Sequence, residues 1–227
     1  MNPDKIYTGR STIRMYRADC ADLMKTGKKW DLAIVDPEYG IDMGARKGRH
    51  SKGQDPNYFN APKYKTGSWD KEPAGYYYFE QIKKVTKNQI VWGANHFVHH
   101  LPISRGWVFW DKMPIVPNYS DGELAWTSFD MVLKRVVVHW NGKIRTGIEP
   151  GYKCIHPTQK PIKLYKWLIT NYAKPGDTIL DTHGGSMSIA IACWDLGFDL
   201  DICELDKEYF DAAVKRFENH IAQQTLF

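Results

Sequence analysis

The segment 176–206, which reads GDTILDTHGGSMSIAIACWDLGFDLDICELD, constrains the fold more than any other part of the chain. Its first apolar run predicts a buried strand, and two glycines then predict a turn. We expect a helix to start at Ser186 and a second strand to end at Glu204. A strand, a helix and another strand in this order are typical of α/β proteins. The segment therefore predicts a parallel sheet covered by helices.

The rest of the chain continues this alternation. Further apolar or β-branched runs predict strands at 12–16, 31–36, 89–93 and 106–111. A helix is expected after Lys160-Pro161, because proline suits a first helical turn, and another after Asp206, which can cap it. The sequence thus predicts an α/β fold with a mostly parallel sheet.

Length and composition agree with one globular domain. The chain has 227 residues, of which 43% are hydrophobic, enough for a core. No window has the roughly 18 uncharged apolar residues of a membrane span, and the N-terminus lacks the apolar centre of a signal peptide, so we expect a cytoplasmic protein. The cysteines lack CxxC spacing, which argues against a metal site or a disulfide framework and favours reduced core residues. They are Cys20, Cys154, Cys193 and Cys203.

The run LAIVDPEYG at 32–40 is an apolar strand that ends in an acidic, proline-containing and aromatic cluster. In parallel sheets ligands bind beyond the carboxyl ends of the strands, where the glycine turn also lies. That turn lets a ligand approach the backbone, and Glu204 can accept hydrogen bonds from a ribose. The absence of GxGxxG argues against a dinucleotide. A nucleoside pocket is one interpretation, and a plain turn is the other.

The formal net charge of +5 does not by itself establish a nucleic-acid partner. Basic residues gather, however, in a glycine-rich loop at 42–69, and they alternate with aromatic residues at about 140–153. The candidate contacts to DNA are Arg46, Lys47, Arg49, Lys52, Lys143 and Arg145. A solvated loop is the alternative for the first region. For 121–140 we consider an antiparallel extension of the core sheet at least as good an interpretation.

Four motifs together resemble one family. DPEYG, HPTQKP at 156–161, DTHGGSMS at 181–188 and ICELD at 202–206 are similar to amino-directed DNA methyltransferases of the circularly permuted beta group. NQIVWGANHF, ELAWTSF and HWNGK resemble segments of small phage and prophage adenine methyltransferases. The resemblance covers nearly the whole chain. It implies a single domain, 1–227, with the Rossmann-like fold of S-adenosylmethionine-dependent methyltransferases and helices on both faces of the sheet.

The resemblance also implies roles for individual residues. Asp36 and the carbonyl of Pro37 would accept hydrogen bonds from the amino group of a flipped-out base, while Tyr39 stacks on its ring. Around the cofactor it implies Asp19 at the adenine, Glu204 on the ribose, Asp181 at the methionine amino group, Gly185 and Ser186 at the turn, and His156, Thr158 and Lys160 at the methionine end. From the residues alone, Asp19 is better interpreted as a helix cap.

Two positions depart from the family pattern. Glu38 stands where relatives have a second proline, and we expect its side chain to turn away from the base. Met187 stands where they have glycine, and the site remains open if its side chain points into the interface between sheet and helix.

The resemblance implies transfer of a methyl group from S-adenosylmethionine to adenine N6 in DNA, directly and in line. Asp36 favours adenine, because enzymes acting on cytosine N4 more often carry serine there. Cytosine N4, a catalytically silent DNA- or cofactor-binding relative, and an RNA or protein-glutamine methyltransferase are the alternatives. The expected target site is short or relaxed. The implied setting is a bacterial cytoplasm, with DNA as partner, a monomer or homodimer, and with or without a restriction enzyme.

Overall fold

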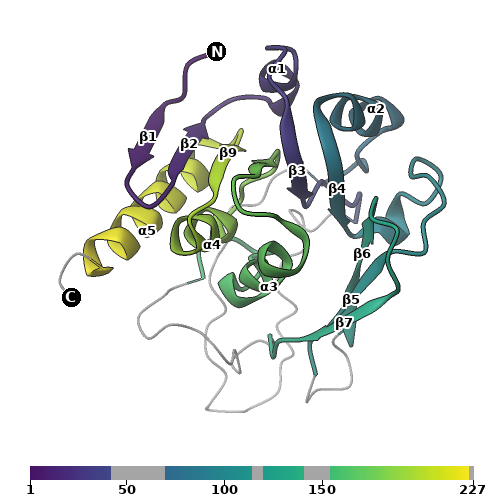
Figure 1. Cartoon of the computed structure of the whole chain (residues 1–227). Helices are drawn as coiled ribbons and strands as arrows, with labels where there is room; N and C mark the ends of the chain where they lie inside the picture. Colours follow the sequence, from purple (N-terminus) through teal and green to yellow (C-terminus); the bar gives the residue numbers. More distant parts are fainter. Residues whose placement is uncertain (42–69, 114–119, 141–153, 225–227) are drawn as a thin grey trace, which may run out of the picture.

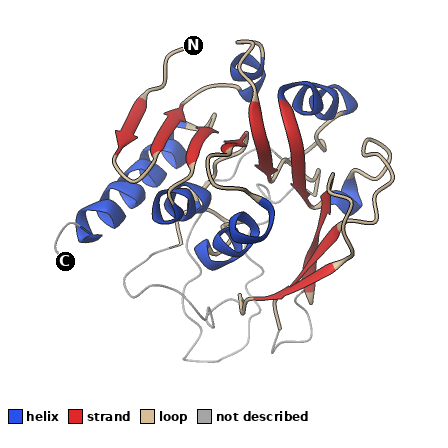
Figure 2. Cartoon of the chain, in the orientation of Figure 1, coloured by secondary structure: helices blue, strands red, loops and turns tan. Residues whose placement is uncertain are grey.

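The computed structural model describes residues 1–41, 70–113, 120–140 and 154–224, and these residues form one nine-stranded sheet with helices on both faces (Figures 1 and 2). The strands are β1 (Lys5–Thr8), β2 (Thr12–Tyr16), β3 (Trp30–Val35), β4 (Thr86–Trp92), β5 (Trp107–Asp111), β6 (Gly122–Thr127), β7 (Lys134–Val137), β8 (Thr178–Asp181) and β9 (Asp199–Cys203). The helices are α1 (Cys20–Met24), α2 (Tyr76–Val85), the short 3-10 helix η2 (Ala94–His96), α3 (Ile162–Tyr172), α4 (Ser188–Leu196) and α5 (Lys207–Gln224).

The strand order is β1-β2-β9-β8-β3-β4-β6-β5-β7. Strands β2, β9, β8, β3 and β4 run parallel, so their carboxyl ends lie at one edge. On one side β1 pairs antiparallel with β2, and on the other β6 pairs antiparallel with β4 and β5. The expected mostly parallel sheet is therefore confirmed.

Alternation along the central strands produces a hydrophobic core on each face. In β3, Leu32 and Ile34 belong to the core that α3, α4 and α5 cover, whereas Ala33 and Val35 belong to the core that α1 and α2 cover. All four side chains are at most 1% exposed. Successive residues of a strand point to opposite faces, so a continuous apolar run supplies both cores.

The ends of the helices agree with the sequence in two cases and differ in a third. Asp206 caps α5, because its Oδ1 accepts a hydrogen bond from the Glu208 N–H at 2.8 Å. Pro161 precedes α3 as its N-cap. The expectation that Ser186 starts a helix is wrong: α4 begins at Ser188, because Met187 takes a left-handed conformation with φ 52°. The turn after β8 is thus longer than expected.

Other differences concern the edges of the sheet and the cysteines. The sequence did not predict β1, a short edge strand. The antiparallel interpretation of 121–140 holds for β6, but β7 pairs parallel with β5. Cys193 and Cys203 are core residues, and the half-buried Cys20 packs against the core, whereas the assignment of the half-buried Cys154 to the core was wrong. The described cysteines are all free.

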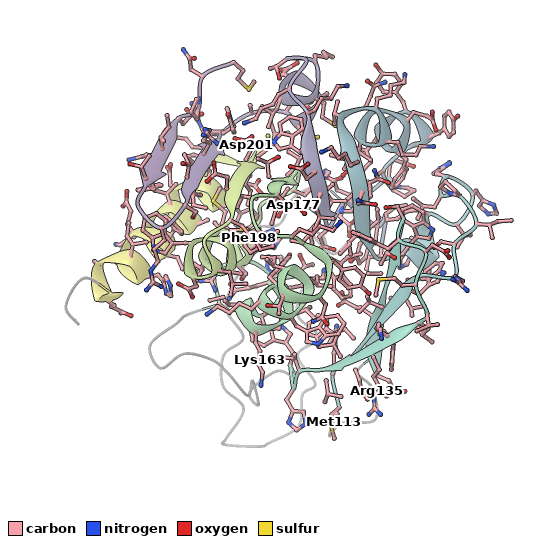
Figure 3. All side chains as sticks on the ribbon, viewed as in Figure 1. Met113, Arg135, Lys163, Asp177, Phe198 and Asp201 are labelled. Carbon is pink, nitrogen blue, oxygen red and sulfur yellow. The ribbon has the colours of Figure 1, made fainter. Side chains whose placement is uncertain are left out.

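The β5–β6–β7 ribbon extends the sheet beyond its parallel part. Figure 3 shows Met113 and Arg135 at the outer end of this ribbon, far from Asp201 on β9. Arg135 Nη2 donates a hydrogen bond to Asp111 Oδ2 at 2.6 Å and so ties β7 to the end of β5. Among the described residues, no helix has both the length and the apolar character needed to cross a membrane.

Candidate active site

The sheet has a topological switch point between β8 and β3. The chain leaves β8 through α4 on one face, and it leaves β3 toward α2 on the other. Because the two connections diverge, a crevice opens between the carboxyl ends of these strands, and in α/β proteins ligands bind in such a crevice. Residues 36–39 after β3 form one wall and residues 182–186 after β8 form the other.

The first wall is fixed to the segment that leads into α2. The Gly40 N–H donates a hydrogen bond to Asp70 Oδ1 at 2.8 Å, and the Ala74 N–H donates one to the Glu38 carbonyl at 3.0 Å. Pro37 is buried. The backbone that carries Asp36 is thus held in place from both sides.

Both carboxylate oxygens of Asp36 have partners. The Tyr39 hydroxyl donates a hydrogen bond to Oδ1, and the Lys160 ammonium forms an ion pair with Oδ2. Lys160 Nζ also lies 3.3 Å from the Tyr39 hydroxyl. A ligand that binds to Asp36 therefore shares this carboxylate with Tyr39 and Lys160 or replaces one of them.

Lys160 is a buried cation with a second carboxylate beside it. Its side chain is 3% exposed, and its Nζ lies 3.2 Å from Glu123 Oε2 on β6. Glu123 forms a further ion pair with Lys112. Burial alone would lower the pKa of Lys160, but the charges of Asp36 and Glu123 outweigh it and raise that pKa above its usual value. Lys160 therefore stays charged.

The ring of Tyr39 packs between other groups. The ring of His96 stacks on it with centroids 5.1 Å apart and an interplanar angle of 12°. The backbone of Gly93, with φ 63°, lies so close that a β-carbon there would fall 2.1 Å from Tyr39 Cε1. Burial, followed by the negative charge of Asp36, raises the pKa of Tyr39 well above its usual value, so the hydroxyl stays protonated and can donate.

The opposite wall is a turn that Glu204, at the end of β9, organises. Glu204 Oε2 accepts a hydrogen bond from the Gly185 N–H at 2.7 Å, and Oε1 accepts one from the Asp206 N–H at 2.8 Å. Gly185 has φ 49°, and a β-carbon there would lie 3.4 Å from His156 Nδ1. Glycine thus meets a conformational need at this position, while a β-carbon would only touch the His156 ring.

Met187 does not fill the cavity. Its side chain is 0% exposed and belongs to the core beneath α4. Ser186 is also buried, and its carbonyl accepts a hydrogen bond from Arg216 Nη1 of α5 at 2.7 Å. The site is therefore open despite the methionine, although Met187 precedes the helix instead of lying within it.

His156 and Thr158 lie beside the turn. Thr158 Oγ1 is 3.1 Å from His156 Nδ1, and the His156 ring contacts the Tyr209 ring with centroids 4.4 Å apart. Burial, followed by the charge of Lys160, lowers the pKa of His156 to about 4. A neutral His156 lines this part of the cavity near neutral pH.

Asp19 follows β2, the strand next to β9. Its Oδ1 accepts a hydrogen bond from the Ala21 N–H at 2.8 Å, so the interpretation as a helix cap is confirmed. The same residue lines the cavity. The two interpretations of Asp19 are compatible, because one carboxylate oxygen serves the cap.

Glu38 and His183 join the two walls. Glu38 Oε2 lies 3.2 Å from His183 Nε2, across the crevice, and both side chains line the cavity. Glu38 is directed toward the turn after β8, whereas Asp36 is directed toward Lys160. The proline-to-glutamate departure thus introduces an ion pair that proline could not form.

The cavity between the walls has a volume of about 600 Å³, within the range of small-molecule sites. It brings together most of the residues that the sequence singled out. They are Asp19, Asp36, Pro37, Tyr39, His156, Thr158, Lys160, Gly185, Ser186 and Glu204. Asp181 lies behind this lining: it is 1% exposed, and its Oδ1 accepts a hydrogen bond from the His183 N–H at 3.0 Å. Burial is the main cause that raises the pKa of Asp181 to about 7.

The candidate DNA contacts Arg46, Lys47, Arg49, Lys52, Lys143 and Arg145, together with the regions 42–69 and 141–153, lie outside the described residues. Sequence reasoning also missed three residues of the site, Glu123, His183 and His96. A carboxylate at the start of the apolar strand ELAWT and a histidine inside a glycine turn were the available signals.

This arrangement defines the class of the protein. A crevice at a switch point, a glycine turn and a carboxylate after the next strand are the features of α/β proteins that bind nucleoside-containing cofactors. The solved complex of M1.HpyAVI with SAM is similar to this chain at 22% sequence identity, covers 90% of this chain and 99% of that chain, and gives a TM-score of 0.55. The PvuII DNA methyltransferase, described as cytosine-N4-specific, is similar at 16% identity with 92% and 90% coverage and a TM-score of 0.58. The expected fold of S-adenosylmethionine-dependent methyltransferases is thereby confirmed.

The family follows from the sequence comparison. The model of the DNA methylase family N6_N4_Mtase matches residues 49–215, so the chain belongs to this family. It is therefore a DNA methyltransferase, and S-adenosylmethionine is its cofactor, as the sequence predicted. The matched range begins after Tyr39, and the roles of individual residues stay predictions.

Proposed function

We propose that the chain transfers the methyl group of S-adenosylmethionine to N6 of an adenine that has been turned out of the DNA helix. The observation that carries this proposal is the position of Asp36. Its carboxylate lies at the end of β3, on the wall of the cavity that faces the glycine turn. In this proposal the acceptor of the base and the site for the cofactor share one crevice.

The chemistry explains why a fixed carboxylate is useful here. The lone pair of an adenine amino group is delocalised into the ring, so the nitrogen is a poor nucleophile. Asp36 Oδ2 and the Pro37 carbonyl would accept hydrogen bonds from its two N–H groups, favour a pyramidal nitrogen and direct its lone pair at the methyl group. Turning the base out costs a few kcal/mol, which stacking can offset.

In the present arrangement two donors share the Asp36 carboxylate. Tyr39 occupies Oδ1 and Lys160 occupies Oδ2. We infer that the base amino group displaces Lys160, whose charge then stays neutralised by Glu123 at 3.2 Å. Removing one partner from a buried charge is costly, so the second carboxylate lowers the cost of this exchange.

The residues of the second wall fit S-adenosylmethionine. Glu204 is held by the N–H groups of Gly185 and Asp206, and lone pairs on its oxygens remain available for two ribose hydroxyls. Asp19 would accept from the adenine amino group, and His156 and Thr158 would lie at the methionine end. Bound there, the cofactor would supply an electrophilic methyl group on a sulfonium. The chain's own residues would bind the cofactor and orient it.

Asp36 supports adenine as the target, because enzymes acting on cytosine N4 more often have serine there. We further propose that Arg46, Lys47, Arg49, Lys52, Lys143 and Arg145 contact DNA phosphates. Because the regions 42–69 and about 140–153 offer few residues for contacts to base edges, we expect a short or relaxed target sequence.

The test is to incubate unmethylated DNA with labelled S-adenosylmethionine, digest it and identify the modified nucleoside. N6-methyladenine supports the proposal, and N4-methylcytosine would replace adenine by cytosine as the target. No product despite measurable cofactor binding would make the chain a silent relative. Asp36→Ala, which removes the acceptor oxygens, should abolish transfer and leave cofactor binding within about threefold. Activity that survives this change would refute the catalytic role of Asp36.

A further inference from the structure

The ion pair between Glu38 and His183 spans the crevice at the switch point, where the cofactor is expected. Glu38 belongs to the loop after β3, and His183 belongs to the turn after β8. We propose that Glu38 is a positioning residue that ties the catalytic loop to the cofactor turn and neutralises His183, so that the cavity accepts a positively charged cofactor. The proposal rests on the cofactor site described above and is independent of which base is methylated.

The imidazole of His183 is held from several sides. Its own backbone N–H donates to Asp181 Oδ1 at 3.0 Å, and its Nδ1 lies 2.8 Å from Thr182 Oγ1. Thr182 Oγ1 in turn lies 2.6 Å from the Tyr78 hydroxyl of α2. The Tyr78 ring packs edge-on against the His183 ring, with centroids 5.4 Å apart. These contacts together hold the ring so that its Nε2 points at Glu38.

These contacts accommodate a charged or a neutral imidazole. In the charged form both ring nitrogens donate, one to Glu38 and one to Thr182. In the neutral form Nε2–H still donates to Glu38, while Nδ1 accepts from the Thr182 hydroxyl, which can accept from Tyr78. Since neither form leaves a polar atom of this chain of contacts without a partner, the charge of His183 can change without rearrangement of the turn.

The charges that surround the pair favour the charged form. His183 faces Glu38 across the crevice, Asp181 at the end of β8 and Glu204 at the end of β9. Burial lowers the pKa of His183, but the negative charges of these three residues outweigh it and raise that pKa above its usual value. Burial likewise would raise the pKa of Glu38, yet the charge and hydrogen bond of His183 lower it to about 2. The thiol of Cys20 on α1 also lies near Glu38.

The charge of the ligand makes this arrangement testable. S-adenosylmethionine carries a net positive charge from its sulfonium, whereas the product S-adenosylhomocysteine is neutral overall. Without Glu38, a charged His183 would face the cavity with less compensation, and it would repel the substrate cofactor more than the product. A contact that only stabilised the turn would affect both ligands alike.

The experiment measures the dissociation constants of both ligands by calorimetry for the wild-type chain, Glu38→Gln, His183→Gln and the double variant. Thermal melting first establishes that each variant is folded. At pH 6 we expect Glu38→Gln to raise the dissociation constant of S-adenosylmethionine by about tenfold and that of S-adenosylhomocysteine by less than about threefold. The double variant should regain most of the lost preference, and Glu38→Gln should regain it as the pH rises and His183 loses its proton.

Glu72→Gln is the matched control, since it removes one exposed negative charge from the segment that follows the catalytic loop. It should leave both dissociation constants unchanged. An equal loss for both ligands in Glu38→Gln, or a loss that the double variant keeps, would overturn the proposal while the cofactor site stands. Failure of the wild-type chain to bind either ligand would instead overturn the cofactor site and this inference together.

Discussion

Gly93 lies directly against the ring of Tyr39: a β-carbon at position 93 would fall 2.1 Å from Tyr39 Cε1 and 2.3 Å from Cζ. Gly93 follows β4 and Tyr39 follows β3, the neighbouring strand. The glycine has φ 63°, a left-handed conformation that other residues rarely adopt. Space and conformation both require glycine, so the position of the Tyr39 ring depends on a residue from another strand.

The first prediction is that Gly93→Ala displaces the Tyr39 ring and lowers the rate of methyl transfer by about 100-fold, because small misplacements at a reacting centre are costly. Binding of S-adenosylmethionine should change by less than about threefold, since Gly93 does not line the cavity. The measurements are single-turnover transfer and calorimetry.

Gly27→Ala is the control for backbone strain alone. Gly27 also has a positive φ, 83°, but a β-carbon there would meet nothing within 4 Å. This variant should lose some stability and keep full activity. Equal activities of Gly93→Ala and Gly27→Ala would show that the contact between position 93 and the Tyr39 ring does not affect methyl transfer.

The second prediction concerns the buried charge of Lys160. Lys160→Met leaves Asp36 and Glu123 without their shared cation, so the free energy of unfolding at pH 7 should fall by about 3 kcal/mol. In the native chain the charges of Lys160 and Lys112 outweigh burial and lower the pKa of Glu123. The stability that the cation provides is therefore present above pH 4.5, the ordinary pKa of glutamate, and declines as the pH falls further.

Urea denaturation of both chains at several pH values checks this prediction, and the difference between them should shrink in acid. Lys87→Met is the matched control, because Lys87 also pairs with a carboxylate, that of Asp31, but its side chain is 75% exposed. An exposed ion pair contributes little, so this variant should unfold nearly as the native chain does. A Lys160→Met chain as stable as this control would contradict the prediction.

The third prediction separates the role of Glu123 from that of Lys160. Glu123→Gln leaves Asp36 as the principal carboxylate for Lys160, so the base amino group has to compete with a full ion pair. We expect kcat to fall by about tenfold, equivalent to about 1.4 kcal/mol, with an unchanged dissociation constant for the cofactor. Lys112→Gln keeps the contact between Lys160 and Glu123 and should have the smaller effect. A kcat that does not change in Glu123→Gln would rule out the proposed exchange.

The fourth prediction concerns Asp181, whose pKa burial raises to about 7. A raised carboxyl pKa means that the folded chain binds the proton more tightly than the unfolded chain, so stability is lost as the pH rises from about 4 to about 7. Asp181→Asn still accepts the His183 N–H but carries no charge. Without cofactor it should be more stable than the native chain at pH 8, by on the order of 1–3 kcal/mol, and no more stable at pH 4.

The same variant tests the expected role of Asp181 at the methionine amino group. If the carboxylate compensates that positive group, Asp181→Asn should show a smaller rise in Tm on addition of S-adenosylmethionine at pH 8 than the native chain. An equal rise in both chains would assign Asp181 to the turn alone.

The sequence by itself determined the elements that depend on local pattern. The apolar run before Asp36 predicted a buried strand at 31–36, and β3 spans Trp30–Val35, within one residue at each end. Asp206 caps α5 because the cap and the first helical turn are neighbours in the chain. Parallel strands bring their carboxyl ends to one edge, so the pattern itself placed Asp36 and Glu204 at one site, whereas only the family resemblance placed Asp19 there.

The tertiary structure decided what depends on contacts between distant residues. The start of α4 moved from Ser186 to Ser188, because Met187 packs into the core in a left-handed conformation that its own propensity disfavours. The partners of Asp36 and Glu38, namely Lys160, Glu123 and His183, come from strands and loops far away in the sequence. Local propensities fix where a strand ends, whereas the pairing of buried charges follows from how the strands are ordered in the sheet. That order set Glu38 opposite His183.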